Sequence, residues 1–515
     1  MSVTTSQPSF PAEAEIIVQL RKKLQTTETQ LQWAELKIQA LEEKLRKVRL
    51  AKYGAGSEKL SNEQLDLLEL EPGVSGKEVQ AESQRPAVPP PAKPRQKHPG
   101  RQPLPPDLPR VEKIVPCSAE QCVCPGCGGQ REIIGHEESE QLDVEPAKYF
   151  VRVSKREKRA CGKCEAGGVA TAPLPPRIIA KGLASDAIVI DTVVSKYCDH
   201  LPLYRQSAIL ARDAGVEVSR ATLDDWVLHV GELLVPLVGA MRHELLSESY
   251  IQADETPVLV QMHDGRGKNH QAYLWQYGCP GGNVIFDFRL GRERDGPKKF
   301  LGQFNGILQS DGYAAYDQIG GPNLVHVGCW AHGQRYFAQA LELNPHDPLT
   351  PSILTPIREL FVIDAEAREQ GLTLEARHGL RQEKSRPLLG VIRKQVEAAR
   401  SQVLPASALA KACNYMLGQW DRLTRCLDYP QVELSNNWAE NSMRPVAVGR
   451  KNWIHIGSPQ AGPKIAAILS VVESCRRQKI PVRSYLGSVL PGLADMPIQR
   501  LPELTPAAWN KQQRS

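Results

Sequence analysis

Apolar residues recur at alternating steps of three and four positions along the N-terminal segment. One member of the series is polar, and the members are Ile17, Leu20, Leu24, Thr27, Leu31, Ala34, Ile38, Leu41, Leu45 and Val48. An alternation of this kind, kept over five heptads, is typical of a coiled-coil seam. It predicts a self-associating helix over residues 12–52. The alternative is a single amphipathic helix that lies on another domain.

The middle of the chain changes to a pattern of short apolar segments bounded by turn residues. Strands are predicted at residues 250–260, 271–277, 283–290 and 306–310, and the last of them runs into an Asp-Gly-Tyr sequence. Three antiparallel strands followed by a fourth that ends in Asp-Gly describe the opening of an RNase H-like sheet. In that arrangement Asp254 lies within the first strand and Asp311 lies at the tip of the fourth.

Helical patterns precede these strands. Residues 203–213 form one predicted helix, Gly215 lies in a turn, and Ser219 is placed to cap a second helix that continues through Trp226 and Val230. The pattern suits a helix-turn-helix, which would bind DNA. An ordinary helical hairpin with a glycine turn fits the same pattern equally well.

The length of 515 residues is too great for one compact core, so several domains are expected. Residues 71–110 are rich in proline and basic residues, which predicts an extended linker. The predicted fold is therefore multidomain α/β. Its parts are a coiled coil (12–52), the linker (71–110), a small zinc-binding module (111–175), a helical DNA-binding domain (182–245), an RNase H-like catalytic domain (246–480) with a helical insertion (about 338–427), and a C-terminal tail (481–515).

Composition and charge narrow the class of protein only a little. The net charge of +6 and the pI near 8.6 fit a nucleic-acid partner, although an excess this small over 515 residues is more often a mildly basic surface. No apolar run approaches the roughly 20 residues that a membrane span needs. Residues 1–12 lack the basic start and apolar core of a signal peptide. We therefore expect a cytoplasmic protein without a membrane partner.

Half of the twelve cysteines fall between residues 117 and 164. Two CxxC pairs, Cys124 with Cys127 and Cys161 with Cys164, each include a glycine, as a knuckle around tetrahedral zinc requires. The alternating sequence between the pairs, at residues 141–153, predicts strands. A structural Zn²⁺ held by these four thiolates is expected, and a disulfide pair is the alternative. Cys117 and Cys122 lie near enough to replace a member of the first pair.

A third acidic residue follows in the C-terminal half. Asn436, Glu440 and Arg444 are spaced by four residues and therefore lie on one face of a predicted helix. A carboxylate between an amide and a guanidinium can bind a metal while its neighbours contact phosphate. An ordinary Glu–Arg helix pair, which contributes about 0.2–0.5 kcal/mol, has the same spacing.

The motifs around these acids resemble transposases of insertion sequence family 66. The resemblance rests on Ala253-Asp-Glu-Thr256, Ser310-Asp-Gly-Tyr313, Cys329-Trp-Ala-His332, Asn436-Asn437-x-x-Glu440, Arg444-Pro445 and Gly449-Arg-Lys-Asn-Trp453. It extends to Pro202-Leu-Tyr-Arg205, Thr222-Leu-x-x-Trp226, the two CxxC pairs and the heptad segment, and so covers nearly the whole chain. Three positions depart from the pattern of many relatives: Gln334, Ser435 and Asn441.

The resemblance implies a DNA transposase of the DDE type, with Asp254, Asp311 and Glu440 as catalytic residues. They would bind two Mg²⁺ ions per active site, about 3.5–4 Å apart, or Mn²⁺ in their place. Asp254 would bridge the two ions. DNA at the ends of the element would be cleaved, and the freed 3′-hydroxyl would then attack target DNA.

The resemblance also implies contacts with DNA and with other proteins. Phosphate contacts are expected from His332, Arg335, Arg444, Arg450 and Lys451. The expected partners are transposon and target DNA, further copies of the chain bound through the coiled coil, and small companion proteins of the same element. Two alternatives remain: a catalytically inactive DNA-binding relic, and a nuclease without strand transfer.

Overall fold

The computed structural model describes residues 13–53, 118, 122, 126–127, 129–130, 133, 148–160, 169–179, 182–262, 265 and 269–514. By its internal contacts the chain divides into two units, residues 1–85 with 154–515, and residues 86–153. The described helices and strands all belong to the first unit, so the account below concerns that unit.

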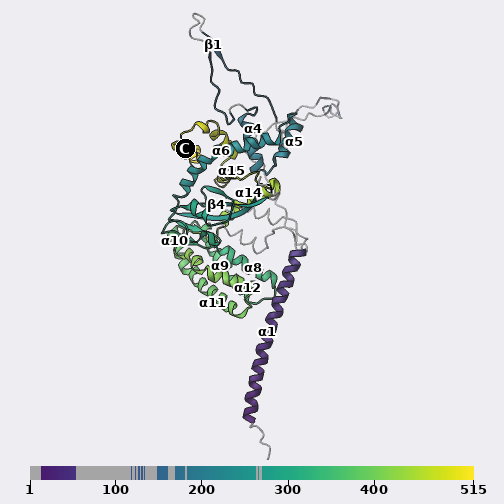
Figure 1. Cartoon of the computed structure of the whole chain (residues 1–515), viewed down its shortest axis with the longest axis vertical. Coiled ribbons are helices and arrows are strands. Elements are labelled where there is room, and N and C mark those ends of the chain that lie inside the picture. The colour runs from purple at the N-terminus through teal and green to yellow at the C-terminus, as the bar shows by residue number, and fades with distance from the viewer. Residues whose placement is uncertain are drawn as a thin grey trace, which may run out of the picture. The chain divides into compact units, whose positions relative to one another are not determined.

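Helix α1 (Glu13–Tyr53) covers the segment of the heptad pattern and is purple in Figure 1. The apolar positions of the predicted seam are largely exposed: Leu24 is 60% exposed, Leu31 59% and Leu41 58%. A regular row of exposed leucines is a surface that a partner helix can cover.

A two-stranded antiparallel sheet is formed by β1 (Lys158–Ala160) and β2 (Val169–Thr171). Strands were predicted at residues 141–153, and for the described part of that stretch, 148–153, the prediction is wrong. Phe150 and Val151 are 76% and 88% exposed. Alternation stabilises a strand only where one face is buried, and these side chains bury neither face.

Three helices follow: α4 (Asp186–Tyr197), α5 (Leu203–Ala214) and α6 (Arg220–Leu245). Helix α5 ends at Gly215, whose φ of +64° is the left-handed conformation that glycine adopts without strain. The side chain of Ser219 accepts a hydrogen bond from the backbone N–H of Thr222 over 3.1 Å, which confirms the predicted cap.

Helix α6 is longer than the sequence pattern predicted. It continues past Val230 and through Pro236 to Leu245. Leu234, Leu237 and Met241 on this extension are fully buried. Tertiary packing therefore outweighs the helix-breaking tendency of the proline.

The central sheet has five strands in the order β5-β4-β3-β6-β7. The pairs β3–β4 and β4–β5 are antiparallel, whereas β3–β6 and β6–β7 are parallel. The four strands predicted from the pattern are confirmed within a few residues at each end. The strands are β3 (Tyr250–Val260), β4 (His270–Gly278), β5 (Val284–Arg289), β6 (Ile307–Gln309) and β7 (Val325–Val327).

Helices α7 (Asp295–Leu301), α14 (Asn437–Trp453) and α15 (Ala461–Arg477) pack on this sheet. Helix α14 lies against β3 and β4, and α15 lies against β5 and α6. A Cβ atom at Gly278, the last residue of β4, would lie 2.4 Å from the ring of Trp438 in the first turn of α14. The missing side chain at Gly278 therefore lets α14 approach the sheet.

Between β7 and α14 the chain forms a helical insertion, in which α8, α9, α11 and α12 group together in Figure 1. Its core includes the buried residues Phe337, Ile357, Ile392 and Met416. The helices begin at Trp330, before the predicted boundary near residue 338. The insertion comprises α8 (Trp330–Leu343), α9 (Leu349–Glu369), α10 (Leu374–Leu380), α11 (Arg386–Gln402), α12 (Ala408–Gly418) and α13 (Trp420–Thr424).

A buried ionic cluster joins the insertion to the segment that precedes α14. Arg377 forms ion pairs with Asp364 over 2.6 Å and with Glu433 over 2.9 Å. Arg368 contacts the same two carboxylates, and Arg381 contacts Asp364. Burial opposes ionisation of Asp364, but the nearby guanidinium groups outweigh it and lower its pKa.

After α15 the chain continues in α16 (Val482–Val489) and α17 (Pro506–Arg514). The hydroxyl of Tyr485 donates a 2.6 Å hydrogen bond to the carbonyl of Leu504, and Tyr485 is fully buried. The segment expected to be a tail is therefore a packed part of the first unit. None of the described helices carries an apolar run long enough to cross a membrane.

Candidate active site

The three acidic residues singled out in the sequence lie on three neighbouring elements. Asp254 is in the middle of β3, Asp311 lies two residues beyond the end of β6, and Glu440 is in the first turn of α14. Since β6 is the parallel neighbour of β3 and α14 packs on β3, the fold brings the three carboxylates together.

The electrostatics of Asp254 reflect this convergence. Burial raises the pKa of the Asp254 carboxyl well above its usual value, and the charges of Glu440 and Glu255 are the next causes. The charge of Asp311 adds to the same rise in pKa. The mutual repulsion of these groups favours binding of a cation between them.

Asp311 stands in a tight turn whose geometry depends on the following glycine. Gly312 has a φ of +88°, and a Cβ atom there would lie 2.9 Å from the side chain of Gln419. An Oδ1 atom of Asp311 accepts a 2.9 Å hydrogen bond from the backbone N–H of Tyr313. The Asp-Gly sequence therefore forms the turn just beyond the strand and orients the carboxylate.

A buried pair of glutamines connects the three elements and is called the glutamine clamp here. Gln252 donates hydrogen bonds to Gln309 over 3.1 Å and to the carbonyl of Ser435 over 2.9 Å, and it accepts one from the N–H of Ala439 over 3.2 Å. Gln309 donates to the carbonyl of Glu433 over 2.8 Å. Both glutamines are fully buried.

The glutamine clamp therefore holds β3, β6 and the start of α14 in register next to the three acids. Asn436 adds a further bond between the same elements, because its Nδ2 donates to the carbonyl of Ala253 over 3.1 Å. Sequence reasoning missed the glutamines. The one signal was a glutamine that follows two apolar residues and stands two positions ahead of each acid.

Glu440 is bound by two residues of α8. The guanidinium of Arg335 donates to both carboxylate oxygens of Glu440, over 2.9 and 3.2 Å, and Nε2 of His332 lies 3.5 Å from Oε1. Burial opposes ionisation of Glu440, but Arg335 and His332 outweigh it and lower its pKa. The pKa of His332 is lowered, first by burial, although the charge of Glu440 opposes this.

A fourth carboxylate, Glu255, adjoins Asp254 and was not assigned a role from the sequence. Its side chain forms a 2.6 Å ion pair with Arg292 and accepts a 2.9 Å hydrogen bond from the hydroxyl of Tyr316. The guanidinium of Arg292 also lies 3.9 Å from the ring centre of Tyr313. Burial raises the pKa of Glu255.

The five residues expected to contact DNA phosphates have different surroundings. His332 and Arg335 are bound to Glu440 as described above. Arg450 donates to the hydroxyl of Thr256 and the carbonyl of Pro257, each over 2.8 Å, so it connects α14 to β3. Arg444 is half-buried and its charge helps to lower the pKa of Glu440, whereas Lys451 is exposed.

The donor set of the acidic site suits a hard divalent cation, since Asp254, Asp311 and Glu440 offer carboxylate oxygens only. Burial, and then the charges of the neighbouring carboxylates, raise the pKa of Asp254, and a bound cation would favour its ionised form. Among the described residues, however, no three acidic, histidine or cysteine side chains are arranged to enclose a metal ion. The carboxylate of Glu440 is bound by Arg335 in this arrangement.

Of the four cysteines expected to bind zinc, the structure describes Cys127, which is exposed. Cys124, Cys161 and Cys164 lie outside the described residues. The β1–β2 pair flanks the second CxxC sequence, as the termini of a zinc knuckle would.

Three families of known proteins match separate segments of this chain. The family described as "Transposase IS66 family" matches residues 181–464, which hold all three acidic residues. The "zinc-finger binding domain of transposase IS66" matches residues 121–165, which hold both CxxC pairs. A third family, "Transposase C of IS166 homeodomain", matches residues 40–112.

Curated relatives include three proteins of Sinorhizobium fredii (strain NBRC 101917 / NGR234), each titled as an uncharacterized protein. Protein y4hP is 30% identical over 503 residues, which cover 92% of this chain and 89% of the relative. Protein y4jD is 32% identical over 430 residues, 80% of this chain and 82% of the relative. Protein y4qI is 32% identical over 490 residues, 90% of this chain and 88% of the relative.

Proposed function

Because this chain belongs to the IS66 family of transposases, we propose that it cleaves DNA at the ends of a mobile element and joins those ends to target DNA. Asp254, Asp311 and Glu440 are the catalytic carboxylates of this proposal. Their convergence from β3, β6 and α14 is the observation that carries it. The raised pKa of Asp254, caused first by burial and then by neighbouring carboxylates, supports the same assignment.

The catalytic domain of the proposal is RNase H-like. Its support is the strand order β5-β4-β3-β6-β7, with three antiparallel strands followed by two parallel ones. One acid within the first of these strands in sequence and one after the fourth agree with the expectation from the sequence.

Mg²⁺, or Mn²⁺ in its place, would be held by Asp254, Asp311 and Glu440. The ions supply activation of the attacking oxygen and stabilisation of the leaving oxyanion. The chain's own contribution is to orient the carboxylates, through the glutamine clamp and the turn at Gly312. Arg335 neutralises Glu440 in this structure, and it would become available to a DNA phosphate if Glu440 held an ion in its place.

DNA is bound by several parts of the chain in this proposal. Arg444, which is half-buried, and Lys451, which is exposed, are two of the candidate phosphate contacts on α14. The zinc module, with Cys124, Cys127, Cys161 and Cys164 as ligands, and the helical domain of α4, α5 and α6 bind the element's ends. On α6, however, Asp224 and Asp225 are exposed, so its first turns carry negative charge that opposes phosphate, and Lys196 is a nearby counter-charge of Asp224.

The proposal includes self-association of the chain, because transposition must bring two DNA ends together. The exposed seam of α1 is a surface on which two copies of the chain pair. Small companion proteins of the same element are further proposed partners.

The test compares Asp311→Asn with Arg444→Ala in the full chain. Asp311→Asn should abolish Mg²⁺-dependent nicking of DNA that carries the element's ends, yet leave affinity in EDTA unchanged or slightly raised. Arg444→Ala should weaken binding and lower its salt dependence by about one counterion. Full cleavage by a folded Asp311→Asn chain contradicts the assignment.

Product analysis separates the proposal from its two rivals. Cleaved ends that are never joined to a supercoiled target indicate a nuclease. Binding of the ends without any nicking by the unaltered chain indicates a DNA-binding relic.

A further inference from the structure

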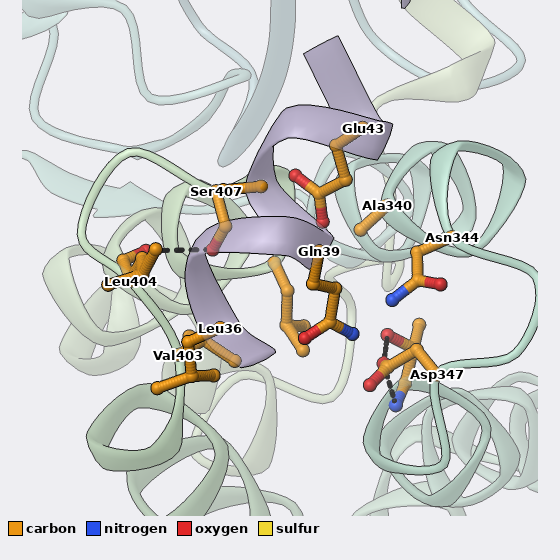
Figure 2. Close-up of a pocket in the computed structure, with 12 residues that line it drawn as sticks. Leu36, Gln39, Glu43, Ala340, Asn344, Asp347, Val403, Leu404 and Ser407 are labelled. Carbon is orange, nitrogen blue, oxygen red and sulfur yellow. Dashed lines mark hydrogen bonds between the residues drawn. The ribbon is translucent and has the colours of Figure 1, made fainter. Parts of the chain in front are cut away.

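Helix α1 contacts the insertion through the side that faces away from its seam. Leu36, Gln39, Ala40 and Glu43 of α1 lie against the ends of α8 and α12 and the loops beside them, as Figure 2 shows. In the heptad register that places Ile38 and Leu45 on the seam, these residues are on the opposite surface. The space left at the contact is only ≈ 20 Å³, room for about one water molecule.

Two polar contacts in this region match the charges of helix ends. Oε2 of Glu43 accepts a 3.2 Å hydrogen bond from the backbone N–H of Ala408, the first residue of α12. The guanidinium of Arg46 donates over 3.3 Å to the carbonyl of Leu343, the last residue of α8. An acid at a helix N-terminus and a base at a helix C-terminus are each favourable with the helix dipole. The contact is therefore complementary in charge as well as in shape.

The same two helices reach the candidate active site with their other ends. On α8, Arg335 binds Glu440 over 2.9 Å. On α12, the hydroxyl of Tyr415 donates a 2.6 Å hydrogen bond to the backbone carbonyl of Asp311. Each helix thus has one end against α1 and the other against a catalytic carboxylate or its backbone.

Close packing joins α8 and α12 near the active site. A Cβ atom at Gly333 would lie 2.6 Å from the terminal methyl group of Met416. The rings of Tyr336 and Tyr415 lie 4.8 Å apart. Two helices in such contact move together, because a densely packed interior leaves little room for one to shift alone.

We propose that α1 couples pairing of two chains to the arrangement of the candidate active site, through two of its faces. Its seam pairs with a second copy of the chain, and its outer face holds α8 and α12 in the position that sets Arg335 against Glu440 and Tyr415 against Asp311. Pairing of the seams stabilises α1 as a helix, and α8 and α12 carry that order to the active site. The inference rests on the proposed function in treating Asp311 and Glu440 as catalytic.

The experiment compares two charge reversals at the same heptad position of the full-length chain. Glu43→Lys places a positive charge against the N-terminus of α12. Lys22→Glu is the matched control, three heptads earlier and outside the contact with the insertion. Hydrogen exchange is measured on the metal-free, DNA-free protein, and light scattering reports its association.

Glu43→Lys should leave association unchanged, since the seam is untouched. It should speed exchange roughly two- to tenfold in the first turn of α12, and also in the stretches around Arg335 and Tyr415. Lys22→Glu should change none of these. Glu43→Gln, which keeps a hydrogen-bond acceptor but loses the charge, should give a smaller change of the same kind.

Exchange that is unaltered in α8 and α12, or altered in the first turn of α12 alone, overturns the proposal. These measurements need neither metal nor DNA. A chain that never nicks DNA therefore contradicts the proposed function, while the coupling is still decided by hydrogen exchange. If the chain does nick DNA, Glu43→Lys should also slow nicking, whereas Lys22→Glu should not.

Discussion

Gln252 donates a 3.1 Å hydrogen bond to Gln309, and each of these buried glutamines stands two residues ahead of a candidate catalytic acid. Residues two apart on a strand point to the same face, so Gln252 lies on the face of β3 that carries Asp254. The bond therefore fixes the relative height of β3 and β6 at the place where Asp254 and Asp311 must meet.

The glutamine clamp predicts a large effect for Gln252→Leu. The change removes the hydrogen bonds that Gln252 forms with Gln309, with the carbonyl of Ser435 and with the N–H of Ala439, and a hydrogen bond of this kind contributes about 0.5–1.5 kcal/mol. We expect a clear fall in unfolding free energy in denaturant titration, and a larger loss of nicking than of DNA binding. Leu259→Gln, on a half-exposed position of the same strand, is the matched control and should change little.

The seam of α1 predicts loss of association on a helix-breaking change. Leu31→Pro should convert the assembly to single chains in light scattering, because proline costs about 3 kcal/mol within a helix and interrupts the seam. Thr29→Ala, outside the seam, should leave the assembly intact. A wild-type chain that stays monomeric at tens of micromolar contradicts pairing through this helix.

The CxxC pairs predict one zinc ion per chain. Elemental analysis of the purified full chain should find about one equivalent, and Cys161→Ser should lose it. Cys279→Ser, a cysteine next to the central sheet, serves as the control. Retention of zinc by Cys161→Ser would contradict the ligand set.

His326 predicts a pH dependence of stability. Burial, and then the charge of Arg422, lower its pKa from 6.5 to about 3, and its Nε2 lies 2.7 Å from the hydroxyl of Ser310. The unfolded chain therefore binds a proton that the folded chain does not, so stability falls as the pH drops below about 6.5, by at most about 1.4 kcal/mol per unit. The melting temperature of His326→Gln should decline less between pH 6.5 and 4.5 than that of the unaltered chain. If the melting temperatures of the two proteins decline equally over this pH range, the lowered pKa of His326 is contradicted.

Local pattern was sufficient to predict the strands of the central sheet, because their apolar segments are short, bounded by turns and buried. The position of Asp311 after β6 was predictable for the same reason. The length of α6 was not, since α6 packs on α15, which follows more than two hundred residues later in the chain. Long-range packing of that kind leaves no local signal.

The candidate site, like the fold, was predictable from the sequence only in part. Asp254, Asp311 and Glu440 were identified by motifs, whereas the surroundings of Arg335 and Arg450 depend on contacts across about a hundred residues or more. Both had been expected to face DNA, and both contact the protein itself. Only the folded chain shows that a guanidinium is already engaged.

The cluster of Asp364, Arg368, Arg377 and Arg381 with Glu433 limits how this protein can be shortened. Excising the insertion to obtain a minimal catalytic core would leave Glu433 as a buried charge without its guanidinium partners, at a cost of several kcal/mol. The backbone of Glu433 also forms hydrogen bonds with Gln309 on β6 and with Tyr250 on β3. Displacing Glu433 would therefore disturb the two strands that position Asp254 and Asp311. A truncated enzyme would therefore need Glu433 replaced by an apolar residue in the same design step.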